Sequence, residues 1–291
     1  MNPDYALLSA IILSLVLLQL NQRQGSPVLA IINRWLRWFI FAFGAAAIVE
    51  DLGWMDRPYP VVVGTFFLVW FLIETLYNWL AIHALSVSPL PLFPRFTLNH
   101  SGEEWPTLPR FLKIRDWLRA NGFKQVQALK AEVGPSIYLR VSVYQDAEAG
   151  VRLQITFLPQ GNGALAVCYS LSTNTAGGYR YVTDNLHLPF GGFYPENWLM
   201  SRNPWRRSLA GLVKLHRERV ARGGEQVVPW TTDPLTDLNG QQRELERINT
   251  ELGFLAPHAD REEHGKISHE GRYRVWKEYW LLSYFGKSVR Y

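Results

Sequence analysis

The sequence predicts a membrane protein with three N-terminal transmembrane helices followed by an α+β cytoplasmic domain, in which helices pack on an antiparallel β-meander. Two observations favour this fold class. The long apolar stretches all lie before residue 86, although the mean hydropathy of the whole chain is only −0.08. Charge divides at the same place, with 4 basic and 5 acidic residues through Leu85 and 26 basic and 20 acidic residues after it. We therefore expect a membrane anchor at 1–85 and a basic domain at 108–291, joined by a proline-rich connection at 86–107.

The first two membrane helices are predicted at about residues 5–22 and 27–49. The first has no basic residue before it and no small-residue cleavage site, so we expect it to be retained rather than removed as a signal peptide. Ser26 followed by Pro27 is a typical start for the second helix, because serine caps a first turn and proline fits the first helical position. The small residues from Gly44 to Ala47 predict close packing against a neighbouring helix.

The third membrane helix is predicted at about residues 60–84, because this stretch is almost unbroken apolar sequence and a bilayer needs about 20 such residues. Its single carboxylate, Glu74, would cost several kcal/mol if it stayed charged and unpaired in hydrocarbon. Arg37 of the second helix lies at a similar depth when residues are counted from the membrane surface. We predict an intramembrane ion pair between Glu74 and Arg37. A structural role is favoured over a proton relay, because few other ionisable groups accompany the pair.

The orientation follows from the charges of the two short connections. Arg23 lies in the first connection, with Arg34 and Arg37 close by, whereas the second connection carries three acidic residues and one basic residue over Glu50 to Arg57. Basic residues favour the cytoplasmic side of a membrane. We therefore expect three crossings of the cell (inner) membrane, with the N-terminus outside and the C-terminal domain in the cytoplasm.

The predicted elements of the domain follow from hydrophobic period and turn residues. They are a helix at 108–120, strands at 123–130, 137–145, 151–158, 164–171 and 179–183, and helices at 203–220, 236–252 and 268–285. The single cysteine, Cys168, excludes an intramolecular disulfide and lies in a strand pattern, where a thiol is typically a small core residue.

Two of the predicted helices carry surfaces suited to partners. The helix at 203–220 and its flank are strongly basic, which favours anionic lipid or an acidic protein surface over nucleic acid. The basic residues are Arg206, Arg207, Lys214, Arg217, Arg219 and Arg222. The last helix combines aromatic and basic residues and is the expected contact helix, although packing of its aromatic side against the sheet is the more ordinary use. The aromatic residues are Tyr273, Trp276, Trp280 and Tyr284.

No motif in the chain specifies a reaction or a cofactor. Asp184 and His187 are the best general-base candidates, because a carboxylate can orient an imidazole, but a loop histidine and a turn aspartate explain them as well. His258, His264 and His269 could supply metal ligands near several acidic residues, yet their spacing matches no helical zinc motif and the region resembles a polar loop. No catalytic residue and no metal site is therefore assigned.

The function expected from these features is that of a non-catalytic accessory or scaffold subunit of a membrane protein complex. The expected partners are membrane lipids and other membrane protein subunits. An energy-converting respiratory or photosynthetic assembly would suit such a subunit, but no cofactor motif indicates one. The sequence leaves two alternatives open: a membrane-tethered enzyme acting on a lipid or anionic substrate, and a membrane-anchored nucleic-acid binder.

Overall fold

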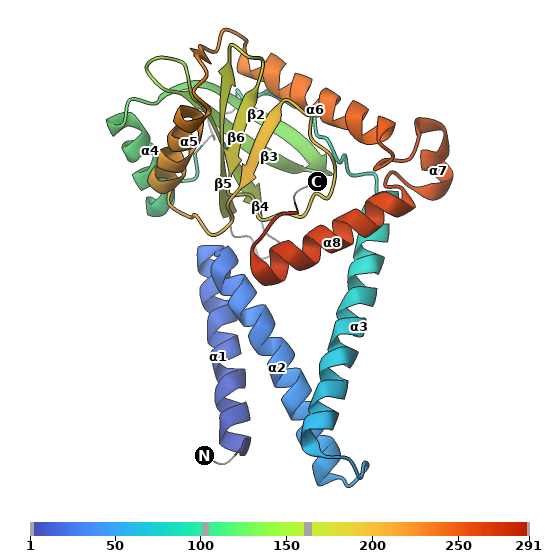
Figure 1. Cartoon of the computed structure of the whole chain (residues 1–291). Helices are drawn as coiled ribbons and strands as arrows, with labels where there is room; N and C mark the ends of the chain where they lie inside the picture. Colours follow the sequence, from blue (N-terminus) through green and yellow to red (C-terminus); the bar gives the residue numbers. More distant parts are fainter. Residues whose placement is uncertain (1–2, 101–104, 160–164, 290–291) are drawn as a thin grey trace.

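The computed structural model describes residues 3–100, 105–159 and 165–289, and it contains three long helices at one end and a domain of sheet and helices at the other (Figure 1). The helices are α1 (Pro3–Gln24), α2 (Pro27–Asp51) and α3 (Tyr59–Val87). Within the described residues, these three helices are the ones long and apolar enough to cross a membrane. The start of the strand predicted at 164 and residues 101–104 of the predicted proline-rich connection lie outside the described residues.

Caps and small residues define the membrane helices as expected. The side chain of Ser26 accepts a hydrogen bond from the backbone amide of Leu29, which confirms the predicted cap of α2. Gly44 faces α1, where an added Cβ would lie 3.4 Å from Leu7, and the fully buried Ala46 packs against α3. The stripe of small residues therefore lets α2 approach both neighbours within this chain.

The three helices run in the alternating directions that three crossings require. The N-terminal end of α1 and the connection between α2 and α3 lie at the end of the bundle far from the domain (Figure 1). The connection between α1 and α2 and the C-terminal end of α3 lie at the end beside the domain. This arrangement is compatible with membrane insertion.

The domain is built on a mixed sheet rather than the predicted antiparallel meander. In chain order its strands are β1 (Phe96–Leu98), β2 (Lys124–Gly134), β3 (Ile137–Gln145), β4 (Arg152–Pro159), β5 (Leu165–Thr175), β6 (Arg180–Asp184), β7 (Trp198–Arg202) and β8 (Val227–Val228). Strands β1 to β6 pair in sequence order and antiparallel, β7 pairs parallel to β6, and β8 pairs with β5. The meander prediction is wrong at β7, because residues 185–197 carry the chain back to the same end of the sheet before the strand begins.

That return connection crosses the last helix of the chain. Gly191 has φ +70°, and a Cβ there would lie 2.7 Å from the backbone of Arg274. Only glycine therefore fits this close approach. The side chain of Arg274 donates to the carbonyl of Gly191 at 3.0 Å, which fastens the connection to that helix.

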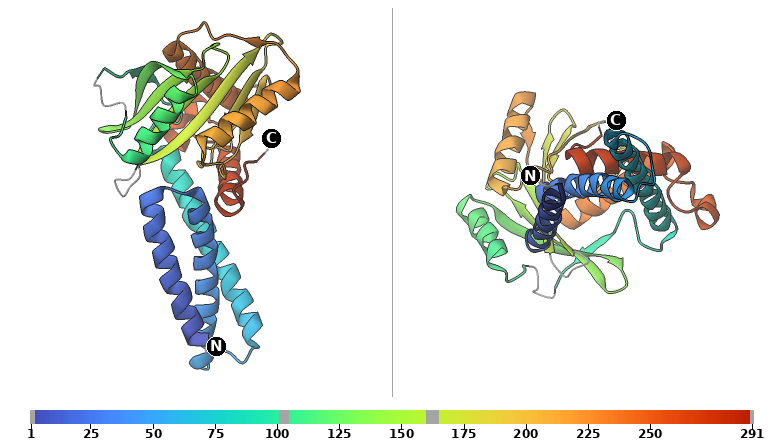
Figure 2. Two further views of the ribbon diagram at one scale, coloured as in Figure 1. Left: turned by 90° about the vertical axis from the view of Figure 1, so that its left-hand side faces the viewer. Right: turned by 90° about the horizontal axis from the view of Figure 1, so that it is seen from below.

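Helices cover both faces of the sheet. On one face, α4 (Pro109–Ala120) and α5 (Leu209–Gly223) pack on alternate side chains of β4 and β5 (Figure 2). On the other face, α6 (Pro234–Glu251) packs on β2 and β3. The chain ends with a short turn of helix η1 (His258–Asp260), then α7 (Arg261–His264) and α8 (His269–Phe285). Helix α5 begins after Ser208 rather than at 203, because Ser208 caps it, while Asn203 is in a turn.

A buried histidine joins α5 to the sheet. His216 is fully buried, and its two ring nitrogens lie 3.0 Å and 2.9 Å from the hydroxyl groups of Thr173 and Thr183. Burial lowers the pKa of His216 to about 3, and Arg219 and Arg217 act in the same direction. The imidazole is therefore neutral in the folded domain at neutral pH.

Because His216 is buried in its neutral form, we expect the stability of the domain to fall in acid. Below about pH 6.5 the unfolded chain binds a proton at His216 that the folded domain does not bind, so stability falls as the pH drops from about 6.5 toward 3. Between pH 7.5 and 5.0 the loss from this group is about 2 kcal/mol. Denaturant unfolding of His216→Gln should show a correspondingly smaller pH dependence. The same substitution at the exposed His258 is the control, and equal pH dependences in the two variants would contradict this role for His216.

Candidate functional site

The most developed polar site lies where α8 crosses the domain-side ends of α2 and α3 (Figure 1). Helices α2 and α3 pack closely near their connection and diverge toward the domain, and aromatic side chains of α8 fill the space between them. Trp280 lies between Trp38 of α2 and Phe71 of α3, at centroid distances of 5.7 Å and 5.0 Å, and stacks on Tyr284 at 4.6 Å. The expectation that the aromatic side of this helix packs on the sheet is therefore wrong.

The four aromatic residues predicted on α8 have different environments. Tyr284 is 2% exposed, and Trp35 of α2 donates to its backbone carbonyl at 2.9 Å. Trp276 contributes to the apolar cluster that includes Ile82 of α3, whereas Tyr273 is 45% exposed. The C-terminal half of α8 therefore makes the more extensive contacts with the helical anchor. Its aromatic side chains pack against α2 and α3 rather than against the sheet.

Glu74 is the centre of this interface. Its Oε1 accepts a hydrogen bond from the hydroxyl of Tyr279 at 3.0 Å, and its Oε2 accepts from the hydroxyl of Tyr284 and from Nε1 of Trp70, the latter at 3.0 Å. Arg34 of α2 donates to the Tyr279 hydroxyl at 2.5 Å. We call these five residues the Glu74 cluster. The tyrosines join α8 to α3, the hydrogen bond from Arg34 to Tyr279 joins α2 to α8, and the contact from Trp70 lies within α3.

The cation of the cluster is Arg34 rather than the predicted Arg37. The nearest nitrogen of Arg34 lies 4.0 Å from Glu74, with side chains 32% and 13% exposed. Arg37 is exposed, and among the described residues it forms no ion pair with Glu74. The number of residues from the membrane surface indicates only the depth of a side chain in the membrane. It does not indicate which side of α2 faces α3, or that α8 lies between the two helices.

The tyrosines of the cluster remain donors at neutral pH. Burial raises the pKa of Tyr279 to about 12, with Glu74 adding to the shift and Arg34 opposing it. Burial and the hydrogen bond to Glu74 likewise raise the pKa of Tyr284. Because both hydroxyl groups stay protonated, they are permanent donors to the carboxylate. The arrangement holds two helices of the anchor and one helix of the domain in a fixed relation.

A second contact between anchor and domain lies at the end of α3. The Ser86 hydroxyl accepts from the backbone amide of Ile267 at 2.9 Å, and the Ser86 carbonyl accepts from the amide of Lys266 at the same distance. Ile82 of α3 is buried in one apolar cluster with Phe93 and Phe254 of the domain. The last turns of α3 therefore share a hydrophobic core with the domain.

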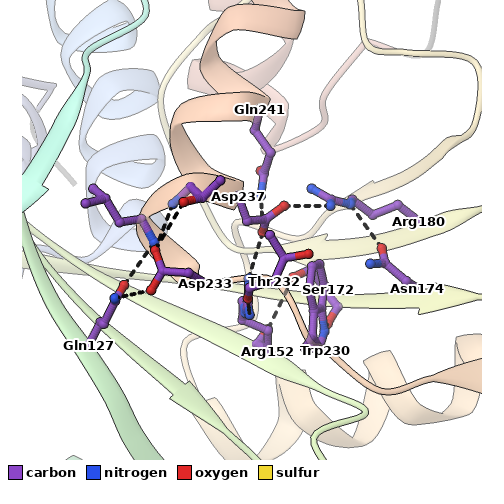
Figure 3. Close-up of polar contacts among 12 residues, drawn as sticks. Gln127, Arg152, Ser172, Asn174, Arg180, Trp230, Thr232, Asp233, Asp237 and Gln241 are labelled. Carbon is purple, nitrogen blue, oxygen red and sulfur yellow. Dashed lines mark hydrogen bonds and ion pairs between the residues drawn. The ribbon is translucent and has the colours of Figure 1, made fainter.

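Inside the domain, a buried ion-pair network joins α6 to the sheet (Figure 3). Asp237 lies 3.0 Å from Arg152 of β4 and 2.8 Å from Arg180 of β6, and the three side chains are 8%, 3% and 15% exposed. Both guanidinium groups also face Trp230, at 4.1 Å and 5.0 Å from its ring centroid. Gln241 donates a further hydrogen bond to Asp237 at 2.9 Å. Each of these side chains has a protein partner, although Nη1 of Arg180 is buried without an acceptor among the described residues. The network therefore serves the fold.

The two general-base candidates do not meet. Asp184 is buried and accepts from Nε of Arg202 at 3.1 Å, and burial raises the pKa of this carboxyl although Arg202 opposes the shift. His187 has its Nε2 at 3.3 Å from the carbonyl of Leu282, and burial lowers the pKa of its imidazole. No contact between Asp184 and His187 is present among the described residues, so the carboxylate does not orient the imidazole.

Cys168 is a poor nucleophile in this structure. It lies in β5, as predicted, and burial raises the pKa of its thiol to about 12, with Asp184 acting in the same direction. A thiol with such a pKa is almost entirely protonated at neutral pH.

The predicted basic residues are distributed among different roles. Arg219 is partly buried and donates to the carbonyls of Val182 and Leu199, both at 2.8 Å, so it ties α5 to the sheet. Arg207 donates to the carbonyl of Gln24 in the anchor at 3.3 Å. The remaining residues, Arg206, Lys214, Arg217 and Arg222, are exposed. A lipid or protein contact by these exposed residues stays a prediction.

The three histidines considered as metal ligands are exposed side chains. In the described parts of the chain, no group of three or more His, Cys, Asp or Glu residues could hold a metal ion. His264 lies 3.9 Å from Glu263, and His269 lies beside Trp79 with ring centroids 6.0 Å apart. His258 belongs to the short turn η1.

Sequence reasoning missed four residues that organise these sites: Arg34, Tyr279, Arg152 and Asp237. Arg34 and Tyr279 lie on helices that the sequence predicts, but neither was identified as a partner of Glu74. The signal that could have linked them to Glu74 is the carboxylate itself, because a carboxylate in the membrane requires hydrogen-bond donors nearby. Arg152 and Asp237 carry no comparable signal, because a buried ion pair between a strand and a distant helix has no local pattern.

Comparison with protein-family models, curated proteins and solved structures found no match.

Proposed function

We propose that this chain is a non-catalytic scaffold subunit of a membrane protein complex, which holds its domain at a fixed position on the membrane surface. The observation that carries the proposal is the α8 interface. A tethered domain that acts alone needs only a flexible linker, whereas here the Glu74 cluster and the Trp280 contacts join the domain to two helices of the anchor. Such a connection suits a protein whose domain must face a partner in one orientation.

The helical anchor supports the proposal because it leaves large apolar surfaces for lipid or other helices. Helices α1 and α3 each have only 6% of their most apolar stretch buried within the chain. On α3, the exposed side chains include Leu68, Leu72 and Leu76. In a membrane these surfaces contact lipid tails or the helices of neighbouring subunits.

We place the protein in the cell (inner) membrane with the N-terminus outside and the domain in the cytoplasm. Arg23 lies in the last turn of α1, and Arg34 and Arg37 lie in the first half of α2, which begins beside the domain. Glu50 and Asp51 end α2 and Asp56 follows it, in the connection far from the domain. The excess of basic residues on the domain side supports a cytoplasmic location for the domain.

Purification of the tagged full chain in a mild detergent tests the scaffold function. We expect a partner that co-purifies in a constant molar ratio and is lost from the Glu74→Ala variant, because a domain released from its anchor no longer presents one surface. The control variant is Glu50→Ala, which removes an exposed carboxylate from α2 and should retain the partner. A monodisperse wild-type chain with no stoichiometric partner would count against the proposal.

A further inference from the structure

A cavity of about 620 Å³ lies between the anchor and the domain, beside the connection of α1 to α2. Its anchor side is formed by residues 21, 22 and 24–27 together with Leu18 and Ala30, and its domain side by parts of α4, β4 and β5, residues 185, 187 and 188 and the start of α5. Cavities that bind small ligands fall in the range of about 300–1,000 Å³. Since the connection joins two candidate membrane spans, the cavity lies at the level where lipid headgroups begin.

The lining carries positive charge without compensating acids. Arg110 and Arg207 both line the cavity, and no aspartate or glutamate does so among the described residues. Ser26 and Ser208, which cap the first turns of α2 and α5, also line it. The partial positive charge of both helix starts therefore adds to the two arginines.

The arginines have protein partners that orient them but do not neutralise them. Arg110 donates to the carbonyls of Arg23 and Leu165 at 2.7 Å and 2.8 Å, and Arg207 donates to the carbonyl of Gln24. Neither forms an ion pair within the described part of the chain. The Nε of Arg110 is buried and has no acceptor among the described residues. An anion that entered the cavity would supply the missing counter-charge.

Much of the remaining lining is apolar, although Asn21, Gln22, Gln24, Asn185 and His187 also line the cavity. Leu18 and Pro27 of the anchor face Phe111, Ile114 and Leu188 of the domain across the same space. A small soluble anion would leave this apolar surface unused. A molecule that joins a phosphate to hydrocarbon uses both parts of the lining.

We propose that this cavity binds the phosphate headgroup of an anionic phospholipid, with Arg110 and Arg207 contacting the phosphate and the apolar lining contacting the start of the acyl chains. This lipid site does not depend on the scaffold function, because it would exist whether or not the domain has a protein partner. It gives the domain a second attachment to the membrane, at the connection of α1 to α2.

The test is lipid retention by the full chain, reconstituted in bilayer discs of phosphatidylcholine and phosphatidylglycerol in equal amounts. After extraction in mild detergent, the bound lipid is identified by native mass spectrometry. We expect selective retention of phosphatidylglycerol by the wild type, and about tenfold less in the Arg110→Gln/Arg207→Gln double variant. The control, Arg119→Gln/Arg243→Gln, removes the same charge from exposed sites that belong neither to the cavity nor to the basic surface of α5, and should retain the lipid.

Two further arms separate charge, folding and ligand source. Ala30→Phe fills part of the cavity without changing charge, and should lower retention even if the double arginine variant folds poorly. Millimolar inorganic phosphate should not displace the lipid; if it does, the site belongs to a soluble phosphate and the lipid assignment fails. Equal retention by Ala30→Phe and wild type, or no preference for the anionic lipid, would also overturn the proposal.

Discussion

Glu74→Ala should release α8 from the anchor. The substitution leaves the hydroxyl groups of Tyr279 and Tyr284 without their acceptor, and Arg34 without its counter-charge, in a largely buried interface. Loss of an acceptor from buried donors costs about 2–3 kcal/mol, even though alanine enters a membrane helix more easily than glutamate. Amide hydrogen exchange in α8 should accelerate about 30- to 150-fold for the protein in bilayer discs.

Two further variants test whether faster exchange in α8 results from loss of the hydrogen-bond acceptor at position 74. Glu50→Ala removes an exposed carboxylate from α2 and should leave exchange in α8 unchanged. Glu74→Gln keeps an oxygen that can accept from the tyrosines, so its effect should be smaller than that of alanine. If α8 exchanged at the wild-type rate in Glu74→Ala, the cluster would not hold the domain to the anchor.

Asp237→Ala should destabilise the domain by about 3–5 kcal/mol, because it leaves Arg152 buried at 3% exposure without its counter-charge. Arg180 loses the same partner, while its contact with Asn174 remains. Burial already lowers the pKa of Arg152, and Asp237 opposes that shift, so removing the carboxylate removes the main compensation. Denaturant unfolding followed by tryptophan fluorescence measures the loss.

The matched control lies on the same helix. Glu251 pairs with Arg247 at 2.7 Å, but their side chains are 56% and 54% exposed. Exposed ion pairs contribute about 0–1 kcal/mol, so Glu251→Ala should change stability little. If Asp237→Ala and Glu251→Ala lost similar amounts of stability, burial of the Asp237 ion pairs would not determine how much they stabilise the domain.

Local patterns predicted most helices and strands correctly. The three apolar stretches became α1, α2 and α3, and Ser26 and Ser268 cap the helices that were predicted to follow them. Four period-two segments became β2 to β5; β3 has the predicted bounds, β4 is shifted by one residue, and β2 and β5 each extend four residues further than expected. These elements follow from hydrophobic period and capping chemistry, which act within a few residues.

The errors concern relations between distant segments. Strand β7 was missed because its pairing with β6 depends on the path of residues 185–197, and its side chains show no alternation of burial. The aromatic side of α8 was assigned to the sheet because its pattern indicates a buried surface without indicating what covers it. For the same reason the sequence predicted Arg37 rather than Arg34 as the partner of Glu74, because the pattern of α2 does not indicate which of its sides faces α3.

The central claim is that the domain has one fixed orientation on the anchor, and a distance measurement tests it most directly. Spin labels at Trp54, in the connection between α2 and α3, and at the exposed Arg243 of α6 would span the molecule in a Cys168→Ala background. Double electron–electron resonance in bilayer discs should give one narrow distance distribution that broadens in Glu74→Ala. A broad distribution in the unsubstituted background, or a narrow one that Glu74→Ala leaves unchanged, would contradict the account.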